Sequence, residues 1–382
     1  MSMKNEHGEV LEDFAPEWDA PSPGALIQHE LDATGRTQAD LADRMSISKK
    51  HLNQVIKGAS LTPEFALAIE RSLGVSARLL LKLEAEWRAF RLAEDARADL
   101  AQHVGWLHKF RAEELIRRRI IAPSDDVPTR VEKLLRFFGV SDPPAYERIS
   151  LKLQASFKRS SAYAIDEHAT ALWIQLAVRQ ANFIAMSAPV HDSGRLRRVA
   201  KHLPALTTKD SVNAFVEFQA DLLTAGVILV YVEEVPETRV SGVSLWLDAD
   251  RPMIAVTGRY KYADSLWFAI AHEVAHVLHH LKRTTFLEIS ADEMEERLHH
   301  GDSSDAHEIQ ANSYASELLL AGLGEDELRA VSTKEELVAL ASAVGVAPGV
   351  LAGQYAHLTG DYAKFGKLRN RADLSALGVK AA

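Results

Sequence analysis

The sequence contains no cysteine among its 382 residues. Disulfide bonds, thiol catalysis and zinc sites built from cysteine are therefore excluded. The chain also has no run of about 18 apolar residues that would span a bilayer, and its first residues lack the apolar core of a signal peptide. These absences predict a cytoplasmic protein with no membrane partner.

The chain also lacks an excess of positive charge, because its formal net charge is −9. A protein that coats nucleic acid over its whole surface is excluded, although one locally basic module can still bind DNA. At 382 residues the chain is long enough for two or three domains, since single cores stop growing at about 250–300 residues. No internal repeat is present.

Composition and periodicity divide the chain into four parts. Residues 1–20 are acidic and aperiodic, and they are predicted to form a flexible tail. Short helices are expected over 21–84, a helical connecting domain over 85–205, and a domain containing both strands and helices over 206–382. The sequence therefore predicts a mainly α protein with a small β-sheet, an α+β fold.

The last of these domains contains all the predicted strands. Three β-prone runs occupy residues 227–232, 243–247 and 252–257. A helix is expected to follow from Asp264, a good N-cap residue, to about Leu281. A polar, acidic stretch then precedes another helix that begins near His307.

The first of these two helices contains the pattern His272-Glu273-Val274-Ala275-His276. Positions i and i+4 lie one turn apart on the same helix face, so His272 and His276 can bind one metal ion together. Glu273 would then lie beside the open coordination position, where a general base is needed. The alternative is a buried helix whose histidines only form hydrogen bonds with their neighbours.

A catalytic metal of this kind needs a third protein ligand from another element, because three ligands along one straight helix cannot converge. His279 and His280 are therefore excluded. The remaining candidates downstream are Glu288, Asp292, Glu293, Asp302, Asp305, His307 and Glu308. The context favours Glu308, since small residues at Ala311 and Ala315 let its helix approach the first one closely.

Near the N-terminus, residues 37–58 have the spacing of a helix-turn-helix. Thr37 and Ser48 cap its two helices, and Gly58 closes the second one. The second helix presents side chains of the types that bond phosphates and base edges, namely Lys49, Lys50, Asn53, Gln54 and Lys57. Eight basic and six acidic side chains from Pro21 to Lys82 give this segment a local charge of +2, which suits DNA. A fold used only for dimerisation or protein contact is the alternative.

This segment resembles the Xre-type helix-turn-helix domain of HigA-like antitoxins. The match extends from Pro23-Gly24 through the helix-turn-helix to residues 61–67. One departure is Ser46, where the family commonly has a glycine in the turn. Serine can occupy such a position at some cost in strain.

The C-terminal half resembles the ImmA/IrrE family of zinc metallopeptidases, on residues 268–276 together with the later Glu308-x-x-Ala311-Asn312-x-Tyr314-Ala315. The resemblance implies that His272, His276 and Glu308 bind Zn²⁺ and that Glu273 is the general base. Asn312 is a candidate for a supporting role around the metal. The family implies an endopeptidase that cuts a repressor protein.

The leading hypothesis is therefore a DNA-binding transcriptional regulator with a zinc-dependent endopeptidase domain. Its partners would be a DNA operator, a repressor-like protein substrate or a toxin, and a second copy in a homodimer. The alternative is a non-catalytic repressor or antitoxin whose zinc-binding fold senses or scaffolds.

A basic run at Arg117-Arg118-Arg119 is more typical of a solvated helix face than of a phosphate contact.

Overall fold

The computed structural model describes residues 21–157, 166–238, 240–258, 262–279, 286–289 and 306–377. The predicted tail and His280 lie outside the described residues. Contacts divide the chain into two compact units, Met1–Gly105 with Asp125–Glu132, and Trp106–Ser124 with Lys133–Ala382. This division falls within the predicted connecting domain, whose extent stays a prediction.

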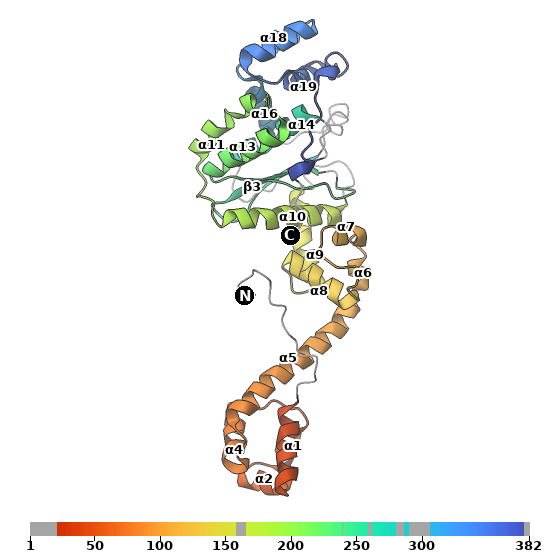
Figure 1. The fold of residues 1–382 in the computed structure, drawn as a ribbon, viewed down its shortest axis with the longest axis vertical. Helices are drawn as coiled ribbons and strands as arrows, with labels where there is room; N and C mark the ends of the chain where they lie inside the picture. The colour runs from red at the N-terminus through yellow and green to blue at the C-terminus, as the bar shows by residue number, and fades with distance from the viewer. Residues whose placement is uncertain are drawn as a thin grey trace. The chain divides into compact units, whose positions relative to one another are not determined.

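The first unit contains five helices in its described part, α1 (Pro23–Thr34), α2 (Gln38–Arg44), α3 (Lys49–Ile56), α4 (Pro63–Leu73) and α5 (Ala77–Ala101) (Figure 1). Their apolar faces form one core that includes Ile27, Leu41, Leu52 and Ile69, all fully buried. The close approach of α1 to α3 depends on Gly24, because a Cβ there would lie 2.1 Å from the carbonyl oxygen of Ile56.

The helix caps predicted for this unit are present. Thr37 accepts a hydrogen bond from the Asp40 amide, and Ser48 accepts one from the His51 amide, each at 3.1 Å. Ser46, in the turn between α2 and α3, has a φ of 55°, in the left-handed region where glycine is strain-free. Ser46 therefore adopts the strained backbone conformation that was expected of a serine at this position of the turn.

The second unit contains a four-stranded sheet with the order β1-β3-β2-β4. Its strands are β1 (Ile228–Tyr231), β2 (Val240–Trp246), β3 (Pro252–Val256) and β4 (Phe286–Ile289). β1 runs parallel to β3, whereas β2 is antiparallel to both β3 and β4. The three predicted strands correspond to β1, β2 and β3, but β4 lies in the stretch that was described as polar and acidic, where no strand was predicted.

Helices cover both faces of the sheet (Figure 1). α10 (Glu167–Ala185) lies on one face, where the Trp173 indole donates a hydrogen bond to the Val232 carbonyl oxygen at 3.2 Å. α13 (Ser211–Thr224) and α14 (Ala263–His279) lie on the other, and their buried faces share a core with β1 and β3. Because α14 buries its apolar face against the sheet in this shared core, the sheet fixes the position of the helix.

The other helices complete the described chain. They are α6 (Val104–Leu107), α7 (Ala112–Arg117), α8 (Val127–Phe138), α9 (Pro143–Phe157), α11 (Ser193–Ala200), α12 (Leu203–Leu206), α16 (Ala306–Leu320), α17 (Glu325–Arg329), α18 (Lys334–Val344) and α19 (Pro348–Thr359), with short 3₁₀ turns at Gly366–Leu368 and Ser375–Leu377. No single described helix is long and apolar enough to cross a bilayer, although α18 and α19 together, bent by 114°, meet that test of length and composition.

The basic run at the end of α7 is only partly the solvated face that was predicted, because Arg117 and Arg119 are exposed whereas Arg118 is not. Arg117 and Arg118 both pair with the buried carboxylate of Glu114. Arg118, 11% exposed, also donates hydrogen bonds to the carbonyl oxygens of Glu233 and Glu234. The run therefore anchors α7 to the segment that follows β1, and the periodicity of α7 alone could not reveal this distant partner.

Candidate metal centre

α14 carries the two histidines and begins one residue earlier than predicted. Because the helix starts at Ala263, Asp264 lies inside the first turn and does not cap it. Its carboxylate pairs instead with Arg369, with the Nε atom 2.9 Å away. Burial raises the pKa of Asp264, and Arg369 opposes that effect. The N-cap prediction was wrong because this partner lies far away in the sequence.

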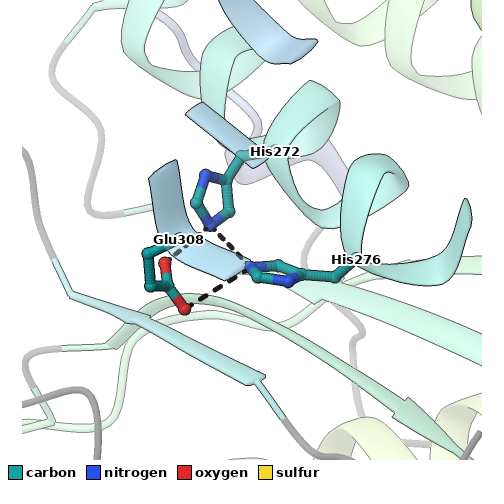
Figure 2. A group of neighbouring side chains, drawn as sticks. All are labelled: His272, His276 and Glu308. Carbon is teal, nitrogen blue, oxygen red and sulfur yellow. Dashed lines mark hydrogen bonds and ion pairs between the residues drawn. The ribbon is translucent and has the colours of Figure 1, made fainter. Parts of the chain in front are cut away.

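His272 and His276 lie on one face of α14 and point toward each other (Figure 2). Their Nε2 atoms are 2.8 Å apart, and each of the two side chains is only 1% exposed. The neighbouring Ala271 and Ala275 are fully buried and small, which lets α16 pack closely against this part of α14.

Glu308, near the start of α16, completes the group (Figure 2). Its Oε2 atom lies 3.2 Å from Nε2 of His272, and its Oε1 atom lies 3.6 Å from Nε2 of His276. One ligand atom from each of the three side chains falls within 4.8 Å of the others. Two helices distant in sequence thus bring three potential ligands to one point.

This group fits a zinc ion by its chemistry and its dimensions. Ligands of tetrahedral zinc at 2.0–2.1 Å are separated from one another by about 3.3 Å, and the three distances here bracket that value. Two imidazoles and one carboxylate are also a known ligand set of catalytic zinc, which leaves the fourth position to water or substrate.

Asn312 fixes the orientation of one of the rings. Its Oδ1 atom lies 2.8 Å from Nδ1 of His272. Because an amide oxygen can only accept, Nδ1 carries the proton and the lone pair of a neutral ring is on Nε2, the atom that faces Glu308. The predicted supporting position of Asn312 therefore agrees with the geometry.

Glu273 follows His272 directly on α14 and is fully buried. The structure does not bring it into the group formed by His272, His276 and Glu308 as a further ligand. The role of Glu273 as general base therefore stays a prediction.

Other residues considered as ligands are placed differently. His307 is exposed on α16, and Glu288 belongs to β4, whose side chains lie outside the description. Asp292, Glu293, Asp302 and Asp305 lie outside the described residues, as do His299 and His300. His279 stacks edge-on against Tyr314 with ring centroids 5.4 Å apart, and burial lowers its pKa.

A chain of aromatic contacts links His272 of α14 to His357 of α19 through Phe268. The ring of Phe268 lies 6.4 Å from that of His272 and 6.1 Å from that of His357, measured between centroids. Burial lowers the pKa of His357. Sequence reasoning missed Phe268, although its position one turn before His272 placed it on the same face.

The side chains expected to contact DNA lie on one helix of the first unit. Lys49, Lys50 and Gln54 on α3 are exposed, Lys57 follows them at its C-terminal end, and Asn53 is partly buried. Leu52 and Val55, on the opposite face of α3, are buried in the core. The five polar side chains are thus available to a partner.

Two family models match the chain. Residues 27–80 match a helix-turn-helix family, and residues 227–352 match the IrrE N-terminal-like domain, a peptidase family. The chain therefore joins a segment similar to an Xre-type helix-turn-helix to a segment similar to the IrrE/ImmA domain, as predicted, whereas the closer likeness to HigA-like antitoxins stays a prediction. Among the curated proteins, the comparison finds no match to this chain.

Proposed function

We propose that this protein is a DNA-binding transcriptional regulator whose C-terminal unit is a zinc-dependent endopeptidase that cleaves a repressor-like protein. The observation that carries the enzymatic part is the convergence of His272, His276 and Glu308, with ligand atoms within 4.8 Å of one another. The match of residues 227–352 to a peptidase family supports the same reaction.

Each residue of the centre has a distinct role in this proposal. Zinc bound by the three ligands would polarise the scissile carbonyl and lower the pKa of a water. Glu273 takes the proton from the attacking water and passes it to the leaving nitrogen. Asn312 holds the His272 ring in the tautomer that coordinates.

Replacing Glu273 tests the enzymatic part. Glu273→Gln keeps the shape of the side chain but removes the base, so we expect full zinc content and a rate of cleavage at least about 100-fold lower. Metal content is measured by mass spectrometry of the purified protein. Cleavage is measured on a proteome-derived peptide library, with the wild-type protein loaded with zinc.

His272→Ala is the matched variant, because it should lose the metal itself. Cleavage by Glu273→Gln at the wild-type rate would refute the mechanism. Zinc binding without cleavage by the wild type, on the library and on co-expressed repressors, would favour the alternative of a non-catalytic repressor or antitoxin.

For the first unit, we propose that α3 binds an operator through Lys49, Lys50, Asn53, Gln54 and Lys57. The exposure of the polar face of α3 supports this role, as does the helix-turn-helix match. Lysines supply phosphate contacts, whereas amide side chains read base edges. Both activities would be exercised in the cytoplasm.

Binding to a DNA fragment selected from a random pool by the wild-type protein tests this part. Lys50→Ala should reduce affinity for all sequences, and Gln54→Ala should cost about 1–3 kcal/mol on the selected sequence only. Lys82→Ala, an exposed lysine of α5 paired with Glu86, is the control. Wild-type affinity for both α3 variants would refute the assignment.

A homodimer is proposed as well, since helix-turn-helix regulators commonly bind two half-sites as dimers. Light scattering of the protein with and without the selected DNA measures this state. A toxin remains the other candidate for the protein partner.

A further inference from the structure

α11, in the second unit, has a solvent face made only of basic and small polar side chains. The segment from Ser193 to Lys209 contains five basic residues and no acidic one, in a chain whose net charge is −9. Positive charge is therefore concentrated here against the overall balance of the molecule. The proposed function assigns no role to this surface.

The helix geometry separates the two faces of α11 completely. Leu196, Val199 and Ala200 are buried in the core and, at 100° per residue, lie within one third of the helix circumference. The basic side chains occupy the opposite side, namely Arg195, Arg197, Arg198 and, just past the end of the helix, Lys201. The whole exposed face is therefore cationic.

In the part of the chain that the structure describes, none of these four basic side chains forms an ion pair, whereas the flanking His202 and Lys209 pair with Asp221 and Glu217. The carboxylate of Asp192, which caps the helix by accepting the Arg195 amide, interacts electrostatically with Arg198 and Arg195. One capping carboxylate offsets at most one of the four positive charges.

We propose that the basic face of α11 binds the phosphate backbone of duplex DNA, as a contact independent of base sequence and additional to α3. A protein partner would need an apolar centre for its interface, and the exposed positions of α11 provide no apolar side chain. Phosphates need only cations, and three arginines suit their geometry. The four cations span about 9 Å along the helix axis, enough for two or three successive phosphates of one strand.

Binding of a 30-base-pair duplex of random sequence to the full chain, followed by fluorescence anisotropy over a range of KCl concentrations, tests this proposal. The variant carries Arg195→Gln, Arg198→Gln and Lys201→Gln together. Arg197 is left unchanged because its charge acts on His279 and Tyr314 beside it. The control variant removes the same charge elsewhere in the second unit, by Arg329→Gln, Lys334→Gln and Lys367→Gln.

The α11 variant should bind the duplex more weakly, with a dependence of log affinity on log salt that is less steep by about 2 to 3, since each lost phosphate contact removes about 0.9. The control should keep the wild-type slope. Equal slopes for the wild type and the α11 variant, with equal melting temperatures, would overturn the proposal.

Two further arms separate this site from the other possibilities. In the first arm, Lys50→Ala and Gln54→Ala are added to the wild type and to the α11 variant, which shows whether the effect of α11 persists when α3 is disabled. A failure of the proposed operator contact through α3 is then distinguishable from a failure of the proposed phosphate contact through α11. Polyglutamate replaces the duplex in the second arm. Loss of polyglutamate binding with unchanged DNA binding would assign the face to an acidic protein, and would also overturn the proposal.

Discussion

At the scale of single residues, the candidate centre combines a ligand and its orienting group on one helix. Glu308 and Asn312 are one turn apart on α16, and both contact His272, through its Nε2 and Nδ1 atoms respectively. The acceptor is a neutral amide, so it fixes the tautomer of the ring without adding a negative charge. Asn312 therefore acts as a positioning residue.

Removing this acceptor should weaken the metal site without removing any ligand. We expect Asn312→Ala to reduce zinc affinity about 10- to 100-fold, and Asn312→Asp, which keeps an acceptor, to restore it. Competition with a chromophoric chelator measures the affinity. Ser313→Ala, at an exposed neighbouring position, is the control. Equal affinities for the wild type and Asn312→Ala would show that the ring is held by other contacts.

At the same scale, the sequence predicted those residues whose roles depend on local geometry. The i, i+4 spacing of His272 and His276, the caps Thr37 and Ser48, and the strained turn at Ser46 follow from positions within a few residues of one another. Asp264 was misassigned because its partner Arg369 is 105 positions away. Periodicity carries no information about such contacts.

At the scale of helices and strands, the elements with the clearest patterns were predicted best. β-prone runs identified β1, β2 and β3, and α14 was expected over nearly the residues that it occupies. The strand β4 was missed because it is only four residues long and adjoins an acidic stretch. The order β1-β3-β2-β4, with one parallel pair, was not predictable, because pairing between strands depends on the global packing.

The pairing of α14 with α16 was predictable in part, unlike the order of the strands, which was not predictable. Small residues at Ala311 and Ala315 of α16 predicted that the two helices approach closely, and both are fully buried. The particular carboxylate that completes the centre followed from context and from the family resemblance, since seven candidate side chains were available in the sequence. Only the geometry shows the oxygen atoms of Glu308 facing both rings.

At the scale of the whole molecule, the core formed by α1 to α5 and the core around the sheet share no residue among those that the structure describes. Chains with two separate cores commonly unfold in more than one step. Only the second core contains α14 and α16, so metal binding should act on one of the two steps.

We therefore expect two transitions in differential scanning calorimetry of the zinc-loaded protein, and a chelator should lower only one of them. With zinc at about 1,000 times its dissociation constant, binding contributes about 4 kcal/mol, which corresponds to roughly 8–16 °C for a unit of this size. His272→Ala should show the lower value with or without the chelator. A single transition that shifts as a whole would contradict this independence.

The distance in sequence between the ligands has a consequence for the unfolded chain. His276 and Glu308 enclose a loop of about 30 residues, and an ion held by both would join its ends. Closing a loop of this length restricts the unfolded ensemble by about 3 to 4 kcal/mol in the chain-entropy model of cross-links. In a protein without a single cysteine, a reversible metal cross-link would thus do the work of a disulfide bond, and its strength would follow the supply of zinc.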